Sequence, residues 1–327
     1  MGVTGKSIAA SLYKSGSNIF YWDDNVDIKN KFKDSKYRIY KNKNFYWKKI
    51  DFLVVSPGIK TKGVNAHKIV KLAKKNKCRV VSEIDLFQEY LEHCRYKNRI
   101  KVIAITGTNG KSTVTALLGH LMRTAGENVQ VGANIGKPAL SLDPLDNSGV
   151  FVLELSSFQL DLLTTAIFDV GVWINLSPDH LERHGGLNGY IRAKTNLFER
   201  RTDASVAIIG VDDSISADLA ENLRQDGIGM VIPISSKGSV SGGVYTVDGQ
   251  LYDHLSGGSV LVTDLQSIPS LRGQHNCQNA AAAFAAARAC GLSIGQAASG
   301  LANYTGLPHR LEEVAVIDGI RYINDSK

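Results

Sequence analysis

The chain has 327 residues, of which 43% are hydrophobic and 21% are charged, and this length allows about two globular domains. No apolar run is long enough to span a bilayer and the start lacks an apolar signal region, so we expect a cytoplasmic protein with no membrane partner. The four cysteines have neither paired spacing nor neighbouring histidines, which argues against a disulfide framework or a metal cluster.

The formal net charge of +7 is distributed unevenly along the chain. Residues 1–100 contain 22 Lys and Arg against 9 Asp and Glu, whereas the remaining residues contain 16 against 22. A basic segment attracts nucleic acid or a phosphorylated metabolite. No nucleic-acid recognition motif accompanies these lysines, and those from 68 to 77 fit the solvated face of one helix, so we expect no nucleic-acid partner.

The first predicted elements form part of a dinucleotide-type unit. Residues 2–7 have the composition of a phosphate-binding loop, but no strand precedes them, so we do not expect them to bind phosphate. A helix over 7–14 and a strand over 18–22 lead to Asp23 and Asp24, where such a unit places an acid that holds a ribose or a base edge. A strand that simply ends in an Asp turn is an equal alternative.

The rest of the first hundred residues predicts a small α/β domain. Strands are expected over 51–56 and 79–81 and helices over 64–75 and 83–92. The arrangement is Rossmann-like, but its first strand is missing, so we expect a domain over 1–97 that is truncated at its start. The polar stretch 95–99 predicts a linker.

A triphosphate cradle follows that linker. The apolar strand 102–105 runs directly into Gly107, Thr108, Asn109, Gly110, Lys111, Ser112 and Thr113 and then into an apolar helix over 114–123. Glycines let backbone N–H groups turn toward phosphate oxygens, the lysine reaches the outer phosphates, and a hydroxyl can ligate Mg²⁺. Ile105 replaces the usual first glycine, so this is a shortened P-loop. Glycine loops also join strands to helices without any nucleotide, but the strand–loop–helix context favours ATP binding.

The elements after the P-loop predict a mainly parallel sheet. Strands are expected over 150–155, 170–174 and 205–209, with a β-rich insertion over 238–262 to which we assign no function. An alanine-dense helix over 276–290 follows, a boundary falls at 307–310, and short strands are expected near 313–317 and 320–323. In such a sheet, sites form where the strands end.

Acidic and imidazole groups stand at two of those strand ends. Glu154 ends the strand 150–155, and Asp179 and His180 follow the strand 170–174. Together they suit a Mg²⁺ on the triphosphate, although a single Glu or His is more often a surface residue. Lys194 lies on an amphipathic helix expected over 188–199, where an ordinary exposed lysine is the alternative.

These residues together make the chain resemble the Mur ligases, ATP-dependent enzymes that add amino acids to peptidoglycan precursors. The matching stretches occur in one order along nearly the whole chain: 107–113, 132–136, 154–160, 175–183, Lys194, 273–279, 307–310 and 324–327. The P-loop marks only the superfamily, whereas 154–160 and 324–327 look particular to the member that adds D-glutamate.

The resemblance implies a role for each matching residue. Lys111 would hold the outer phosphates, Ser112 and Glu154 one Mg²⁺, and His180 a second. Lys194 looks like the lysine that becomes carbamylated in this family and then helps to hold the second Mg²⁺. The implied nucleotide contacts are Asn279, Arg310 and Asp325; the implied muramoyl contacts are Asn134, Ser156 and Ser157; and the implied uridine-diphosphate contacts are Val3, Thr4, Asp23 and Asp24.

The implied reaction joins D-glutamate to UDP-N-acetylmuramoyl-L-alanine through an acyl phosphate, with ATP and Mg²⁺. We expect a monomer with a central ATP-binding domain over 98–306 and only the start of a C-terminal α/β domain over 307–327, so the chain would be truncated at both ends. Four alternatives stay open: an inactive nucleotide-binding fragment, a Mur ligase for another amino acid, a folylpolyglutamate-type ligase, and a nucleic-acid-binding protein, which the basic pI of about 9.1 suggests and whose affinity would fall steeply with salt.

Overall fold

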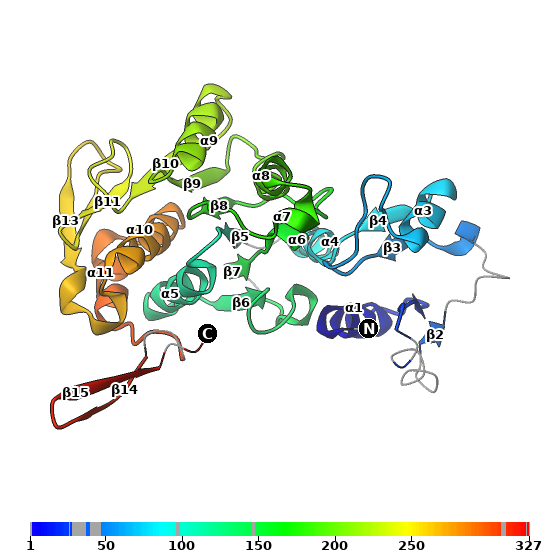
Figure 1. The fold of residues 1–327 in the computed structure, drawn as a ribbon, viewed down its shortest axis with the longest axis horizontal. Helices are drawn as coiled ribbons and strands as arrows, with labels where there is room; N and C mark the ends of the chain where they lie inside the picture. Colours follow the sequence, from blue (N-terminus) through cyan, green and yellow to red (C-terminus); the bar gives the residue numbers. More distant parts are fainter. Residues whose placement is uncertain are drawn as a thin grey trace.

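A computed structural model describes residues 2–25, 27, 37–39, 47–95, 99–145, 148–308, 312–324 and 326. Its centre is a nine-stranded sheet with the order β13-β12-β11-β10-β9-β8-β5-β7-β6 (Figure 1). The strands are β5 (Arg99–Thr106), β6 (Val129–Ala133), β7 (Ser148–Glu154), β8 (Val170–Trp173), β9 (Val206–Gly210), β10 (Met230–Ser235), β11 (Val244–Val247), β12 (Gln250–Asp253) and β13 (Val260–Asp264). Strands β5 to β11 pair in parallel, and β12 pairs antiparallel with both β11 and β13. The predicted α/β class with a mainly parallel sheet is confirmed, and the 238–262 insertion extends this sheet.

Helices cover both faces of the sheet, which is why its strands are apolar on both sides. Along β5, Ile103 and Ile105 face one core while Val102 and Ala104 face the other, as the two-residue period of a strand requires. The first core contains α5 (Lys111–Thr124), α10 (Gln274–Ala289) and α11 (Ile294–Ala302). The second contains α4 (Glu83–Arg95), α6 (Ser157–Leu160), α8 (Leu187–Thr195) and α9 (Ser214–Gln225). In α10 the residues 277–287 are all buried, because alanine side chains allow close packing on both sides of the helix.

The N-terminal part lies beside the central sheet (Figure 1). Its elements are α1 (Val3–Lys14), β1 (Phe20–Tyr21), β2 (Arg38–Ile39), η2 (Trp47–Lys49), β3 (Phe52–Val54), α3 (Lys68–Lys75) and β4 (Arg79–Val81). Strand β1 pairs in parallel with β2, and β3 pairs in parallel with β4. Two expected helix starts were wrong: α1 begins four residues earlier than predicted, at Val3, and α3 begins four residues later. The reason at α3 is a cap, because the His67 ring accepts a hydrogen bond from Ile69 N at 3.3 Å.

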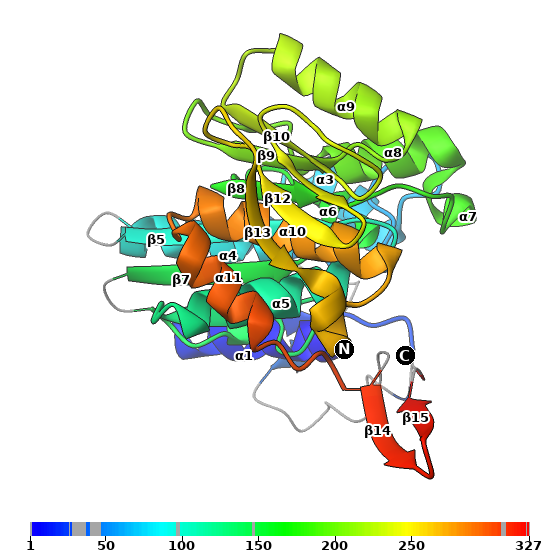
Figure 2. The same ribbon diagram turned by 90° about the vertical axis from the view of Figure 1, so that its left-hand side faces the viewer.

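The remaining elements are short or terminal. They are η3 (Ala139–Ser141), α7 (Leu181–His184), η4 (Leu265–Ser267), η5 (Pro269–Leu271), β14 (Glu312–Ile317) and β15 (Ile320–Asn324). Strands β14 and β15 form an antiparallel hairpin that projects from the body of the molecule (Figure 2). The predicted linker 95–99 overlaps the end of α4 and the start of β5, and its residues 96–98 lie outside the described ranges. No helix in the described ranges has the length and apolarity needed to cross a membrane.

Candidate functional site

The predicted P-loop lies at the carboxyl end of β5, the strand between β7 and β8. Gly110 caps helix α5 with a φ of 82°, a backbone conformation that favours glycine. A side chain on Gly110 would also collide with the amide of Asn279, so this predicted nucleotide contact lies against the loop. Lys111 Nζ donates to the carbonyl oxygens of Gly107 at 3.1 Å and Thr108 at 2.8 Å. The lysine side chain therefore folds back onto the backbone of the P-loop.

Asn175, which the sequence analysis did not single out, supports the P-loop from the end of β8. Its carbonyl oxygen accepts from Thr108 N at 3.1 Å and its Oδ1 accepts from Asn109 N at 3.0 Å. Thr108 Oγ1 donates to the carbonyl oxygen of Ser177 at 3.0 Å. The position of Asn175 two residues after a buried strand, among the matching stretches, was the available signal.

Glu154 ends β7 opposite Ile105 of β5, and only 2% of its surface is exposed. Its Oε1 accepts from Asn134 Nδ2 at 2.7 Å, and Asn134 N donates to the Glu154 carbonyl oxygen at 3.0 Å. Its other carboxylate oxygen, Oε2, is buried with no hydrogen-bond partner among the described residues. A buried carboxylate oxygen without a hydrogen bond lowers the stability of the fold unless a ligand, such as a metal ion or water, satisfies it.

Lys194 is 1% exposed, so the alternative of an ordinary surface lysine is wrong. Helix α8 turns this side chain inward, where Nζ donates to the Gly107 carbonyl oxygen at 2.6 Å and to Thr106 Oγ1 at 3.2 Å. Burial, followed by repulsion from Lys111, lowers the Lys194 pKa to about 7. A neutral amine is therefore accessible near physiological pH directly beneath the P-loop.

Tyr190 completes the contact between α8 and the P-loop and was also missed in the sequence. It precedes Lys194 by one helical turn, so both side chains lie on the same face of α8. The Tyr190 hydroxyl is 3.2 Å from Thr108 Oγ1, and Lys194 Nζ lies 5.0 Å from the centre of the Tyr190 ring. The i, i+4 spacing was the signal that could have found it.

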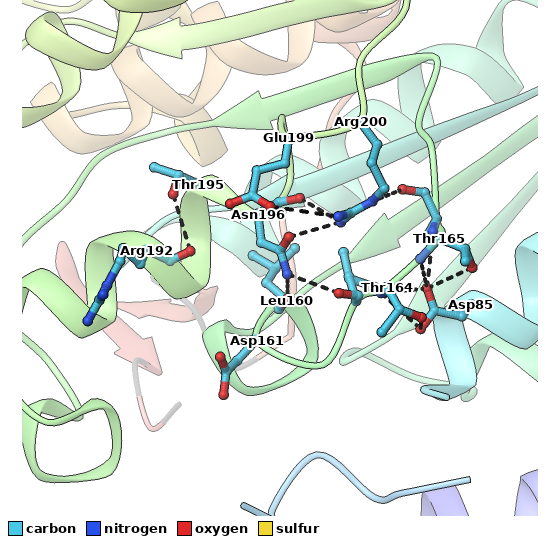
Figure 3. Close-up of polar contacts among 12 residues, drawn as sticks. Asp85, Leu160, Asp161, Thr164, Thr165, Arg192, Thr195, Asn196, Glu199 and Arg200 are labelled. Carbon is cyan, nitrogen blue, oxygen red and sulfur yellow. Dashed lines mark hydrogen bonds and ion pairs between the residues drawn. The ribbon is translucent and has the colours of Figure 1, made fainter. Parts of the chain in front are cut away.

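A polar network fixes the position of the α8 end that carries Lys194 (Figure 3). Asn196 Nδ2 donates to the carbonyl oxygens of Leu160 at 2.6 Å and Leu163 at 3.3 Å. Arg200 donates to Asn196 Oδ1 at 3.0 Å and to the carbonyl oxygen of Ala166 at 3.1 Å. The segment after α6 is therefore held against α8.

Asp85 of α4 holds the same segment from its other side (Figure 3). This carboxylate is fully buried and accepts from the backbone N–H groups of Thr164, Thr165 and Ala166 at 3.0, 2.9 and 3.0 Å. Burial would raise the pKa of Asp85, but hydrogen bonds from Thr165, Ser82 and Thr164 outweigh it and lower the pKa. Three elements, α4, α6 and α8, thus meet around one short loop.

The predicted substrate serines lie at the start of α6. Ser156 caps this helix in a capping box with Gln159. Ser157 Oγ lies 3.0 Å from His184 Nε2, and burial lowers the pKa of His184. Phe158 faces the ring of His180 at 5.1 Å between centroids, which brings the predicted metal ligand His180 alongside α6.

The four predicted uridine-diphosphate contacts share a separate cleft of about 750 Å³ in the N-terminal part. Val3, Thr4, Asp23 and Asp24 all line it. Asp24 Oδ2 lies 2.7 Å from His67 Nε2, and hydrogen bonds from His67 and Trp22 lower the Asp24 pKa. The residues composed like a P-loop at the start therefore form one wall of this cleft as the beginning of α1.

The donor set beside the P-loop fits Mg²⁺. The unsatisfied Glu154 Oε2 is a hard oxygen ligand, and Ser112 lies in the first turn of α5. Among the described residues, no three His, Cys, Asp or Glu side chains gather in a metal cluster. An ion here would therefore take much of its shell from phosphate oxygens and water, as Mg²⁺ commonly does. Arg310 and Asp325, the other two predicted nucleotide contacts, lie outside the described residues.

Comparison with known proteins gives matches over the whole chain. The family model for the Mur ligase middle domain matches residues 105–287. The UDP-N-acetylmuramoylalanine--D-glutamate ligase of Caulobacter vibrioides (strain NA1000 / CB15N) is 39% identical over 327 residues, which cover 100% of this chain and 69% of that protein. The enzyme of the same name from Rhodospirillum rubrum is 39% identical over 332 residues, covering 100% of this chain and 68% of the relative.

Solved structures share the fold at lower identity. A UDP-N-acetylmuramoyl-L-alanyl-D-glutamate--2,6-diaminopimelate ligase superposes with a TM-score of 0.58 at 20% identity, covering 84% of this chain and 66% of that one. The MurF ligase of Thermotoga maritima in complex with ADP superposes with a TM-score of 0.55 at 19% identity, covering 86% and 70%.

Proposed function

The chain belongs to the Mur ligase family, and from that membership we propose that it joins D-glutamate to UDP-N-acetylmuramoyl-L-alanine at the expense of ATP. The reaction would serve peptidoglycan precursor synthesis in the cytoplasm, with the protein acting as a monomer. The observation that carries this proposal is the convergence of Lys111, Glu154 and Lys194 on one P-loop in a chain 39% identical to D-glutamate ligases.

The two sites would divide the substrates between them. The N-terminal cleft would hold the uridine diphosphate, because its lining offers aromatic rings, the carboxylates of Asp23 and Asp24 for a ribose or base edge, and the basic side chain of Lys49. The P-loop domain over 98–306 would hold ATP, with the residues from 307 beginning a further unit. Asn134 donates a hydrogen bond to Glu154, and Ser156 follows Glu154 by two residues. Both would contact the muramoyl part of the substrate.

The ATP site would rely on fixed positive charge. Lys111 and the N-terminus of α5 would face the phosphates, with Asn279 beside the loop. Ser112, Glu154, His180 and a modified Lys194 would hold Mg²⁺, which supplies charge neutralisation at the phosphates when bound.

The chemistry requires activation of a carboxylate. The alanine carboxylate of the nucleotide sugar would attack the γ-phosphorus of ATP, releasing ADP and leaving an acyl phosphate. The amine of D-glutamate would then attack the acyl carbon, form the amide and expel phosphate. In phosphoryl transfer the protein takes little part in covalent bonding, so it accelerates the reaction mainly by positioning the reactants and stabilising charge.

Lys194 has the environment that carbamylation needs. Its lowered pKa of about 7 provides the neutral amine, which would add to the carbon of CO₂ and release one proton, giving a carbamate anion. That anion would replace an unfavourable buried cation by a carboxylate ligand. A carbamate signal in the ¹³C NMR spectrum with labelled bicarbonate, absent in Lys194→Arg, would support this step; identical spectra for the two proteins would exclude it.

The decisive experiment measures phosphate release from ATP and Mg²⁺ with UDP-N-acetylmuramoyl-L-alanine, with and without D-glutamate. We expect release to require both substrates and to fall at least about a hundredfold in Lys111→Ala. Glu154→Ala should behave in the same way while uridine-nucleotide affinity stays near the wild-type value.

Other results would change the assignment. Turnover equal to wild type in both variants would refute the proposed site. Retained binding of both nucleotides without release would leave a nucleotide-binding protein without ligase activity, and release with a different amino acid would identify another member of the family.

A further inference from the structure

A row of three polar side chains runs along the carboxyl edge of the sheet and ends at the P-loop. Asp212 lies in the turn after β9, Gln278 on α10, and Asn175 after β8. Gln278 Nε2 donates to Asp212 Oδ2 at 3.0 Å, and Asn175 Nδ2 donates to Gln278 Oε1 at 2.9 Å. Asn175 Oδ1 then accepts from Asn109 N at 3.0 Å. Residues more than one hundred positions apart are thus joined in one chain of hydrogen bonds.

The direction of this chain is fixed at its Asp212 end. An ionised carboxylate only accepts hydrogen bonds, and Asp212 already accepts from Ser235 Oγ at 2.6 Å and from Ser236 N and Oγ at 2.9 and 2.8 Å. Gln278 must therefore present its NH₂ group to Asp212 and its oxygen to Asn175.

The direction is equally fixed at the P-loop end, because a backbone N–H only donates. If the Asn175 amide rotated by half a turn, its NH₂ group would face Asn109 N and its oxygen would face Gln278 Oε1. One donor would then face another donor and one acceptor would face another acceptor. Both hydrogen bonds of the Asn175 side chain would be lost, and the four groups would be left unsatisfied. The charge of Asp212, acting through Gln278, and the Asn109 N–H therefore favour the same orientation of the Asn175 amide.

The backbone around Asn175 is held independently of Gln278. Asp213 Oδ2 accepts from Leu176 N at 3.1 Å, and Ser177 N donates to Thr108 Oγ1 at 3.0 Å. Loss of the Gln278 amide would therefore leave the Asn175 side chain with one hydrogen bond, from Asn109 N, while the main chain after β8 stays in place.

We propose that Asp212, Gln278 and Asn175 form a positioning relay that sets the shape of the P-loop for ATP. The proposal rests on the proposed ATP-binding function and adds residues that touch no substrate. Phosphate binding requires the N–H groups of the loop to be prearranged. When Gln278 no longer holds the Asn175 amide, the loop at Asn109 can leave that arrangement more easily.

Gln278→Met tests the relay because methionine keeps the length of the side chain and removes both hydrogen bonds. We expect the dissociation constant for Mg²⁺-ADP, measured by calorimetry, to rise about tenfold, the loss of roughly one well-placed hydrogen bond. The dissociation constant for UDP-N-acetylmuramoyl-L-alanine should stay unchanged. Gln225→Met makes the same chemical change on the exposed side of α9 and should alter neither constant.

A double-mutant cycle separates a relay from simple packing of α10. If Gln278 acts through Asn175, then Gln278→Met should weaken ADP binding no further in an Asn175→Ala background. The proposal is overturned if Gln278→Met binds ADP like wild type, if it weakens ADP binding equally in both backgrounds, or if it weakens both nucleotides alike. Failure of the wild-type protein to bind ADP would instead refute the ATP-binding function.

Discussion

Lys194 shows how one buried side chain couples stability to pH. Its pKa falls to about 7 in the fold against 10.5 in the unfolded chain, so between these values the unfolded chain binds a proton that the folded chain lacks. The free energy of unfolding should therefore rise with pH across this window, by up to about 1.4 kcal/mol per pH unit, relative to Lys194→Met. Urea unfolding at pH 7, 8 and 9 in CO₂-free buffer measures the difference, and a pH-independent gap between the proteins would contradict it.

Asp85 is a second buried residue whose hydrogen bonds should contribute strongly to the free energy of unfolding. Asp85→Asn keeps the shape but turns an NH₂ group toward backbone donors at 164–166, so we expect a loss of about 3 kcal/mol in the free energy of unfolding. Asp143→Asn removes an exposed charge and should cost less than about 0.5 kcal/mol. If denaturant unfolding gives equal losses for the two variants, the buried hydrogen bonds of Asp85 stabilise the fold no more than an exposed charge does.

At the scale of elements, α4 joins the N-terminal part to the P-loop strand and holds η3 through a second acid. Glu83 Oε1 accepts from Leu140 N at 3.1 Å, and burial raises the Glu83 pKa to about 7. Since the folded-state pKa lies above the unfolded value of 4.5, the wild type should lose stability progressively as pH rises from 4.5 to about 7.

Glu83→Gln keeps the hydrogen-bond acceptor of α4 and removes its charge. We expect this variant to equal the wild type near pH 4 and to exceed it in free energy of unfolding by up to about 3 kcal/mol near pH 8. Thermal unfolding at both pH values provides the measurement, with the exposed Glu127→Gln as the control. A constant difference between the two pH values would mean that Glu83 does not titrate in this range.

At the scale of the whole molecule, Arg183 links the central domain to the loop that lines the N-terminal cleft. Its Nη2 donates to the carbonyl oxygens of Pro57 at 3.4 Å and Ile59 at 3.2 Å, and its guanidinium lies 5.5 Å from the Phe158 ring. The Arg183 side chain therefore contacts both the cleft loop and helix α6, which begins at the serines predicted to bind substrate.

Arg183→Met should loosen this link without changing the P-loop. We expect KM for the uridine nucleotide to rise about tenfold while KM for ATP changes little, because only the cleft loop loses its support. Arg192→Met, which alters an exposed side chain of α8 (Figure 3), is the matched control. A rise confined to the ATP constant would contradict the proposed division of substrates.

The local pattern of residues was enough to predict the strand–loop–helix of the P-loop, the α/β class and the strand end that carries Glu154, because glycine conformations and two-residue periodicity act over short distances. It was also enough to indicate the ligase family, since several motifs occur in one order. Helix starts were less predictable, since α3 begins where the His67 cap allows rather than where apolar residues begin.

Only the tertiary structure decided the environment of each side chain. Nothing in the spacing around Lys194 distinguished a surface lysine from one buried beneath the P-loop, and nothing linked Asp212 to Asn175 through Gln278. Burial, pKa and hydrogen-bond direction depend on residues brought together from distant parts of the chain. The sequence by itself therefore determined which chemistry this protein carries, and the packing of α8 and α10 against the sheet decided how that chemistry is arranged.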